Sequence, residues 1–341
     1  MPARFKAAVV QAAPEFLRLD DCVDKAIGLM DQAHASGARL IAFPETWFPG
    51  YPWWIWLDSP AAGMPFVARY HANSLQADSP QARALQAAAK RNGLFVMTGQ
   101  SERIGSSLYM GQWLIGDNGD LLMRRRKLKP THVERAIFGE GDGSDLVVTD
   151  TALGRVGALC CWEHLQPLTK YAMYGMQEQI HIGGWPSFSV YPGAAYALGP
   201  EVNTAASRIY AVEGQCFVLG PCATVSPAML EELADTETKR QLLQTGGGYA
   251  VAFAPDGRPL GEPLAPDAEG LLLAEIDLDQ ITLAKSVADP VGHYSRPDVT
   301  RLLLNRRSAK PVETMPAEEP ADLPEEDQPG SPTSPAGTGT H

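Results

Sequence analysis

The amino-acid sequence predicts a layered α/β fold, and three observations support that prediction. The chain has 341 residues, of which 45% are hydrophobic, and this is enough to bury one large core or two smaller ones. Helix-like and strand-like segments are interleaved along most of the chain. A strand, a helix and a second strand follow one another in the first 43 residues, an order that is typical of layered α/β architectures.

The first two strands flank a helix. Residues 5–12 are an apolar run that suits a strand, and residues 39–43 form a second, shorter one. Asp20 can cap the helix between them. This helix is expected to reach about Ser36, where Gly37 stops it.

Residues 46–60 are rich in aromatic side chains. Proline and glycine residues interrupt this segment and exclude a regular helix. Aromatic side chains held on such a loop either line a pocket or pack the loop against itself, and the segment is compatible with both.

A helix and three strands follow. Ser79 is an N-cap residue followed by proline, and the helix that it starts ends near Gly93. Residues 94–98 are expected to form a strand. Residues 108–115 and 121–125 are separated by an Asp-Asn-Gly-Asp turn, so they are expected to pair as a hairpin.

The second half of the chain continues the alternation. The expected strands are residues 155–161, 179–183, 215–219, 248–253 and 270–276, and the expected helices are residues 165–175 and 201–212. Residues 280–304 are too rich in turn-forming residues for regular structure. We therefore expect one folded domain over residues 1–304. Residues 305–341 are acidic and rich in proline, and we expect them to form a disordered tail.

Composition and charge limit the classes of binding partner and the cellular compartment that can be expected for this protein. Residues 311–341 supply −7 of the net charge of −12, so the rest of the chain carries −5. This mildly acidic body argues against nucleic acid and anionic membranes as partners. No apolar run is long enough to span a bilayer, and no signal peptide precedes the first strand. The five cysteines show neither a disulfide pattern nor a zinc-ligand spacing, which favours the reducing cytoplasm.

Three expected strands end at reactive side chains. Glu45 follows residues 39–43, Lys127 follows residues 121–125, and Cys161 ends the strand before the 165–175 helix. Strand ends of an α/β sheet converge in space. A carboxylate beside a thiol can take its proton and pass it to a leaving nitrogen, and an ammonium group can stabilise the anion that forms.

Each of these residues taken alone also fits a structural role. A lysine among several arginines is usually a solvated surface residue, a glutamate after a proline is usually in a turn, and a cysteine often fills a core. Strand alternation places Cys160 and Cys161 on opposite faces, so only one of the two thiols can face a pocket.

Four segments share their sequence with a known family. They are Phe43-Pro44-Glu45, residues 126–135 with 139–143, Cys161-Trp162-Glu163, and residues 289–298. With these segments the chain resembles the nitrilase superfamily of carbon-nitrogen hydrolases over nearly all of residues 5–304. Within it, the chain is most similar to the bacterial arylacetonitrilases.

The resemblance implies the four-layer α-β-β-α sandwich of that superfamily and its chemistry. Glu45 would be the acid and base, Lys127 would stabilise the tetrahedral intermediate, and Cys161 would be the nucleophile. Glu134 would orient Lys127 and share proton transfer. A nitrile would be hydrolysed to a carboxylic acid and ammonia through a thioimidate and a thioester, with some amide as a by-product. No cofactor or metal is implied.

The resemblance also suggests the substrate and the assembly. Residues similar to the arylacetonitrilase pocket are Tyr51, Trp53, Trp54, Trp162, His164 and Trp185. They imply an arylacetonitrile-type substrate such as phenylacetonitrile or mandelonitrile. The superfamily also implies homo-oligomers, in which dimers packed through helices build a spiral.

The sequence leaves three other functions to consider. An amidase or carbamoylase would use the same glutamate, lysine and cysteine on amides, and a cyanide-degrading enzyme would use them on cyanide. A non-catalytic scaffold on the same fold would be expected to have lost at least one of Glu45, Lys127 and Cys161, and all three are present.

Overall fold

The computed structural model describes residues 4–309, 312 and 314. In this part of the chain, thirteen strands form two β-sheets. The strands of the larger sheet are β1 (Arg4–Ala12), β2 (Ala38–Ala42), β3 (Phe95–Ile104), β4 (Ser107–Ile115), β5 (Leu121–Arg126), β6 (Phe138–Gly139), β11 (Cys222–Ala223) and β13 (Gly270–Asp277). The smaller sheet contains β7 (Val148–Thr151), β8 (Gly154–Cys160), β9 (Ile180–Gly184), β10 (Phe217–Gly220) and β12 (Val251–Phe253). In the larger sheet the strands lie in the order β11-β1-β2-β3-β4-β5, and in addition β13 pairs with β1 and β6 pairs with β4. In the smaller sheet the order is β12-β10-β9-β8-β7.

Helices connect these strands. The α-helices among the described residues are α1 (Leu19–Ala35), α2 (Trp54–Leu57), α3 (Pro60–Ala72), α4 (Pro80–Asn92), α5 (Pro167–Gly175), α6 (Pro200–Gly214), α7 (Pro227–Leu233), α8 (Glu237–Leu242) and α9 (Asp279–Val287). Short 3₁₀ helices are η1 (His132–Ala136), η2 (Gly143–Asp145), η3 (Cys161–Leu165) and η4 (Tyr196–Leu198). Parallel pairs such as β1–β2 and β8–β9 are each joined through a helix, as parallel strands require.

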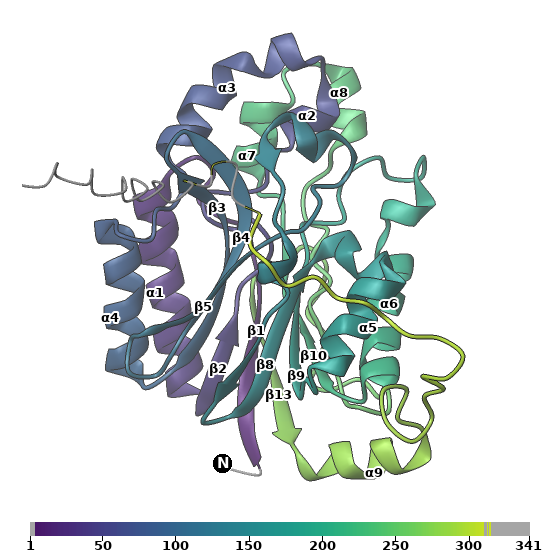
Figure 1. Ribbon diagram of the computed structural model, residues 1–341. Coiled ribbons are helices and arrows are strands. Elements are labelled where there is room, and N and C mark those ends of the chain that lie inside the picture. The colour runs from purple at the N-terminus through teal and green to yellow at the C-terminus, as the bar shows by residue number, and fades with distance from the viewer. Residues whose placement is uncertain (1–3, 310–311, 313, 315–341) are drawn as a thin grey trace, which may run out of the picture. The chain divides into compact units, whose positions relative to one another are not determined.

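The alternation of side chains along the strands produces four layers (Figure 1). On β1, Val9 faces the core between the sheets, while Val10 packs under α1 and α4. On β8, Ala158 faces the same central core, while Leu159 packs under α5 and α6. Both sheets are therefore buried on both faces, and the predicted α-β-β-α sandwich is confirmed.

The helix that begins after Ser79 has the predicted caps at both ends. The Ser79 hydroxyl accepts a hydrogen bond from the Ala82 N–H at 3.1 Å, and Gly93 ends the helix with φ +59°. The predicted cap of α1 is wrong. That helix starts at Leu19, so Asp20 lies in its first turn, where a carboxylate still interacts favourably with the helix dipole.

Two segments predicted to lack regular helix contain one. The aromatic-rich segment forms the single turn α2, because Trp54 packs on Phe66 and Tyr70 of α3. The segment predicted to be irregular after residue 280 begins with α9, where Ile281 is buried in the central core. Tertiary packing outweighs local turn propensity at both places.

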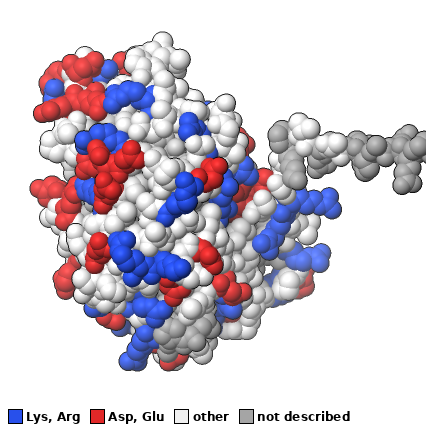
Figure 2. Space-filling view, turned by 90° about the vertical axis from the view of Figure 1, so that its left-hand side faces the viewer, with Lys and Arg blue, Asp and Glu red and all other residues white. Residues whose placement is uncertain are grey.

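The surface carries charges of both signs on the face shown in Figure 2. This face carries α1 and α4, and acidic and basic side chains alternate over it. Arg91 pairs with Asp31 at 2.9 Å and Arg18 with Asp21 at 3.1 Å. A surface of mixed sign is unlike the basic face that binds nucleic acid. Among the described residues, no helix has the length and hydropathy needed to cross a membrane.

Most of the predicted tail lies outside the described residues. Of residues 305–341, the structure describes only 305–309, 312 and 314. The described residues up to Ser308 belong to one compact unit. The disorder of the tail and the domain boundary at residue 304 stay predictions.

Candidate active site

The three reactive residues come from the ends of three strands. Glu45 follows β2 and Lys127 follows β5, both in the larger sheet, whereas Cys161 directly follows β8 in the smaller sheet. The Lys127 Nζ donates to Glu45 Oε1 at 2.9 Å and to Glu134 Oε2 at 2.8 Å. All three charged side chains are buried. A buried ammonium group is therefore held between two carboxylates, as a paired charge must be when it leaves water.

Glu134 is itself held in place by hydrogen bonds. It lies on η1, and its Oε2 accepts a hydrogen bond from the Thr131 N–H at 2.5 Å. Its Oε1 accepts from the Tyr51 hydroxyl at 2.7 Å, and the Trp56 Nε1 donates to that hydroxyl at 3.1 Å. This arrangement can orient Lys127 through Glu134.

Glu45 keeps one oxygen free for proton transfer. Oε1 accepts from Lys127, whereas Oε2 accepts no hydrogen bond from any described residue. Burial raises the pKa of Glu45 to about 8, although the positive charge of Lys127 opposes the shift and the negative charge of Glu134 adds to it. A carboxyl group with a pKa in this range can both accept and return a proton near neutral pH.

The pKa values of Lys127 and Cys161 are also shifted. Burial lowers the pKa of Lys127, but Glu134 and Glu45 outweigh burial and hold it well above its usual value. Burial and the charge of Glu45 raise the pKa of the Cys161 thiol, while Lys127 and a hydrogen bond from the Trp162 N–H lower it. A thiol with a raised pKa needs a base to remove its proton before it can act as a nucleophile.

The raised pKa of Glu45 predicts a pH dependence. If Glu45 acts as the base, kcat/KM should rise with pH as its carboxyl group loses a proton, and the ascending limb should lie near pH 8. An ordinary glutamate would place this limb near its usual pKa of about 4.3. Initial rates at subsaturating substrate across this range would locate the limb. A rate that is constant from acidic to weakly alkaline pH would contradict this role of Glu45.

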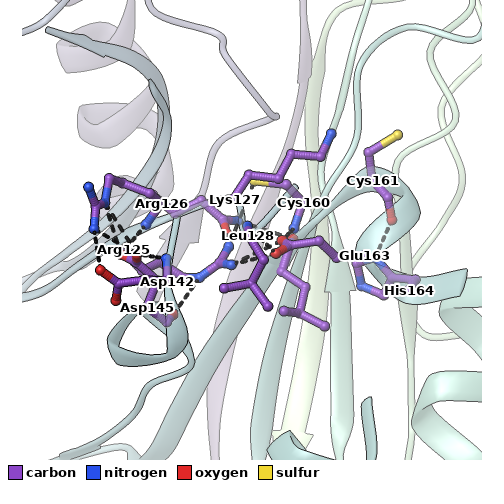
Figure 3. A network of polar contacts seen from close by, with 12 residues as sticks. Arg125, Arg126, Lys127, Leu128, Asp142, Asp145, Cys160, Cys161, Glu163 and His164 are labelled. Carbon is purple, nitrogen blue, oxygen red and sulfur yellow. Dashed lines mark hydrogen bonds and ion pairs between the residues drawn. The ribbon is translucent and has the colours of Figure 1, made fainter. Parts of the chain in front are cut away.

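A second buried ion pair joins the two sheets beneath the reactive residues (Figure 3). Arg125 Nη2 donates to both oxygens of Glu163, at 2.8 and 3.0 Å, and both side chains are buried. The carboxylate also accepts from the backbone N–H groups of Leu128 at 2.9 Å and Cys160 at 2.7 Å. It therefore connects the chain after β5, which carries Lys127, to the end of β8, which carries Cys161.

The Gly139–Gly143 run lies against the backbone of Lys127. The Gly141 N–H donates to the Lys127 carbonyl at 2.9 Å, and a Cβ at Gly141 would lie 2.9 Å from that oxygen. Asp145 accepts from the Arg126 N–H at 2.8 Å and from the Asp142 N–H at 2.8 Å. This family-like run therefore supports the strand end that presents the ammonium group.

A small cavity of about 40 Å³ lies beside Cys161. Its lining residues are Tyr51, Trp53, Trp56, Thr131, Glu134, Cys161, Trp162, Pro186, Ser187, Phe188, Val190, Leu198 and Asn203. Of the two adjacent cysteines, Cys161 lines the cavity, whereas Cys160 is buried in the core.

Three of the predicted pocket residues lie elsewhere. Trp54 points into the cluster with Phe66 and Tyr70 described above. His164 is buried beside the backbone of Cys161, and its ring stacks on Trp185 at 5.0 Å between ring centroids. The Trp185 Nε1 donates to Ser207 at 2.9 Å. Trp54, His164 and Trp185 do not line this cavity, and their contact with substrate stays a prediction.

The other predicted residues line the cavity. Tyr51, Trp53 and Trp162 do so, and their contact with substrate stays a prediction. Trp56 and Asn203 were not predicted as pocket residues. Trp56 belongs to the aromatic run and could have been included, whereas Asn203 lies on α6 with no local signal in the sequence. It reaches the site because its Oδ1 accepts from the Trp162 Nε1 at 2.9 Å.

Comparison with known proteins identifies the family. Residues 6–286 match the sequence model described as Carbon-nitrogen hydrolase, which covers more than half of the chain. The chain belongs to the carbon-nitrogen hydrolase family. A nitrilase from Pseudomonas syringae pv. syringae is 61% identical, over 93% of this chain and 94% of its own. This similarity places the chain in the nitrilase branch and identifies it as a hydrolase of that type.

Two further relatives carry different substrate names. A protein from Alcaligenes faecalis named "Nitrilase, arylacetone-specific" is 52% identical, over 90% of this chain and 86% of its own. An aliphatic nitrilase from Rhodococcus rhodochrous is 51% identical, over 91% of this chain and 85% of its own. Overall identity to these carbon-nitrogen hydrolases therefore does not separate aromatic from aliphatic substrates. Within the described residues, no group of three or more histidine, cysteine, aspartate or glutamate side chains could hold a metal ion.

Proposed function

We propose that Glu45, Lys127 and Cys161 form the catalytic triad of this nitrilase and that Glu134 assists them. The main observation in support is the position of the Lys127 ammonium group. It lies 2.9 Å from Glu45 and 2.8 Å from Glu134, beside the cavity that Cys161 lines. Figure 3 draws the side chains of Lys127 and Cys161 on the same side of the Arg125–Glu163 pair.

The first half-reaction forms a thioester. Glu45 removes the proton of the Cys161 thiol, the sulfur attacks the nitrile carbon, and the proton passes to the nitrile nitrogen to give a thioimidate. Lys127 and the Trp162 N–H stabilise the negative charge that develops on the reacting group. Water adds to the thioimidate with Glu45 as the base, and ammonia leaves after Glu45 returns a proton to the nitrogen.

The second half-reaction releases the acid. Glu45 activates another water molecule, which attacks the thioester, and the Cys161 sulfur leaves with a proton. If the earlier tetrahedral intermediate expels sulfur before nitrogen, an amide forms instead of the acid. The acid-to-amide ratio therefore depends on which leaving group receives the proton.

For the substrate we propose an arylacetonitrile-type nitrile such as phenylacetonitrile or mandelonitrile. The name of the Alcaligenes relative supports this choice, as do the aromatic side chains of Tyr51, Trp53, Trp56, Trp162 and Phe188 around the cavity. The name of the Rhodococcus relative favours an aliphatic nitrile as the second candidate.

A product assay tests both the proposed reaction, nitrile hydrolysis, and the proposed type of substrate. The purified protein is incubated separately with phenylacetonitrile, valeronitrile, phenylacetamide and cyanide, and ammonia, acid and amide are measured together. We expect the highest kcat/KM with phenylacetonitrile, with ammonia and phenylacetic acid in equal amounts and little amide. A preference for valeronitrile would reject the aromatic substrate. Turnover of the amide alone or of cyanide alone would reject nitrile hydrolysis in favour of the corresponding rival.

We also propose that the protein acts in the cytoplasm as a homo-oligomer built from dimers. Helices α5 and α6 expose Leu168 at 69%, Ile209 at 48% and Val212 at 43%, and such apolar side chains suit a helix contact between copies. Light scattering after size-exclusion chromatography should give a mass of two or more chains. Ile209→Asp should lower that mass, and an unchanged mass would exclude α6 from the contact.

A further inference from the structure

A chain of buried hydrogen bonds runs from the backbone of Cys161 into the core (Figure 3 draws its first link). His164 Nδ1 lies 2.6 Å from the Cys161 carbonyl oxygen, and His164 Nε2 lies 2.9 Å from His181 Nε2. His181 Nδ1 lies 2.8 Å from Glu178 Oε1, and the Tyr210 hydroxyl donates to Glu178 Oε2 at 2.7 Å. All four side chains are buried, and none of them lines the cavity.

The Cys161 carbonyl oxygen, at one end of this series of hydrogen bonds, constrains which group donates in each of them. A carbonyl oxygen only accepts, so His164 Nδ1 carries a proton and donates. In a neutral His164 ring, Nε2 is then the acceptor, and His181 Nε2 must donate to it. His181 Nδ1 in turn accepts from a protonated Glu178 or, if His181 is doubly protonated, donates to the Glu178 carboxylate. In both forms His181 donates to His164, and the Glu178–His181 pair is neutral.

Burial favours the fully neutral form. It raises the pKa of Glu178 to about 8, against the opposing effects of Tyr210 and Arg125. It lowers the pKa of His181 well below the usual value, and it lowers the pKa of His164 to about 3, with the neighbouring His181 adding to the effect. A protonated Glu178 can therefore supply the hydrogen bond that sets the tautomer of both rings.

Glycine residues in β8 and β9 of the smaller sheet leave space for this series of hydrogen-bonded side chains. A Cβ at Gly157 of β8 would lie 2.0 Å from Glu178 Oε1, and a Cβ at Gly183 of β9 would lie 2.9 Å from His164 Nε2. Any larger residue at either position would displace a link. The hydrogen-bonded side chains thus fill the space that two glycines leave open. Such a match between the strands and the hydrogen-bonded residues is not expected of residues that only fill a core.

The position of the first link matters because of the peptide that follows Cys161. The carbonyl of Cys161 and the N–H of Trp162 belong to one planar trans peptide and point in opposite directions. That N–H lowers the pKa of the Cys161 thiol, as a donor beside a sulfur atom does. Cys161 also has φ +45°, a left-handed conformation that residues other than glycine rarely adopt and that persists only where the surrounding structure holds it.

We infer that Glu178, His181 and His164 form a relay that holds the Cys161–Trp162 peptide, so that the Trp162 N–H points at the nucleophilic sulfur and at the negative charge formed in the reaction. Glu178 is then a positioning residue that never touches substrate. The inference rests on the proposed role of Cys161 as the nucleophile.

A matched pair of variants at Glu178 tests the relay. In Glu178→Gln the amide can donate to His181 and still accept from Tyr210, so kcat should stay within about threefold of the unmodified enzyme. Glu178→Met keeps a similar volume but cannot donate. The peptide should then lose its fixed orientation, and kcat should fall roughly 10- to 100-fold with KM nearly unchanged, somewhat less than the loss of one oxyanion donor. The rate of Cys161 alkylation by iodoacetamide should fall in parallel.

Thermal unfolding identifies variants that have lost the fold. If Glu178→Met does not fold, the same comparison is made between His164→Asn, which keeps an N–H donor for Cys161, and His164→Leu, which does not. Equal kcat values in the folded donor and non-donor variants would overturn the relay. Activity in Cys161→Ala would instead overturn the proposed nucleophile, so the two failures are distinguishable.

Discussion

Replacement of Cys161 by alanine is expected to abolish nitrile hydrolysis while leaving the fold intact. The thiol is proposed to form the covalent thioimidate, and neither Lys127 nor Glu45 can take over that bond. We expect kcat to fall by at least about 10⁴-fold, as for other enzymes that lose their nucleophile. Because Cys161 is only half-buried beside a cavity, thermal unfolding should change little. Ammonia release from phenylacetonitrile, or from valeronitrile if that is the better substrate, measures the loss.

The adjacent thiol provides the matched control. Cys160 is fully buried in the core, where burial raises its pKa well above the usual value. Cys160→Ala removes a buried sulfur atom, so we expect a loss of about 1 kcal/mol in unfolding free energy but kcat within severalfold of the unmodified enzyme. Full activity in Cys161→Ala combined with inactivity in Cys160→Ala would reverse the assignment of the two cysteines.

Replacement of Glu163 by glutamine is expected to cause a large loss of both stability and activity. The change leaves the buried Arg125 guanidinium without a counter-charge, and breaking a buried ion pair in this way costs about 3–5 kcal/mol. Glu163 is ionised in the folded protein, because Arg125 and two backbone donors outweigh burial and hold its pKa below the usual value. Urea unfolding followed by tryptophan fluorescence measures the loss of stability.

A double replacement separates charge from positioning. In Arg125→Met with Glu163→Met, neither charge of this ion pair remains, so most of the lost unfolding free energy should return. Activity should not return, because the N–H groups of Leu128 and Cys160 have lost the oxygen atoms that align the Lys127 and Cys161 segments. As a surface control, Asp298→Asn in the exposed pair with Arg296 should leave the unfolding midpoint unchanged. A stable and active Glu163→Gln enzyme would show that the ion pair does not join the two segments.

The local sequence was sufficient to predict those structural features that depend on only a few neighbouring residues. The Ser79-Pro80 start and Gly93 end of α4 were predicted because caps depend on adjacent backbone groups. The strands were largely predicted because apolar runs report burial. Glu45, Lys127 and Cys161 were predicted as reactive residues because each lies at the end of an expected strand, and the family resemblance then selected Cys161 over Cys160.

Other parts of the site have no local signal. Arg125 lies between Arg124 and Arg126 in the sequence, and its burial depends on which face of β5 meets the smaller sheet. Trp53 and Trp54 are adjacent and equally aromatic, yet only Trp53 lines the cavity, because α2 turns the next side chain towards α3.

The sequence by itself indicated most of the strands, the helices α1, α4, α5 and α6, the candidate reactive residues at three strand ends and the family. Tertiary structure decided which side chains share a site. Arg125 and Glu163 are 38 residues apart, and His164 and His181 are 17 apart. Each pair meets only when separate strands are set in register. Their hydrogen bonds are strong because the closed sandwich excludes water, a condition that depends on the whole fold and on no short segment of the chain.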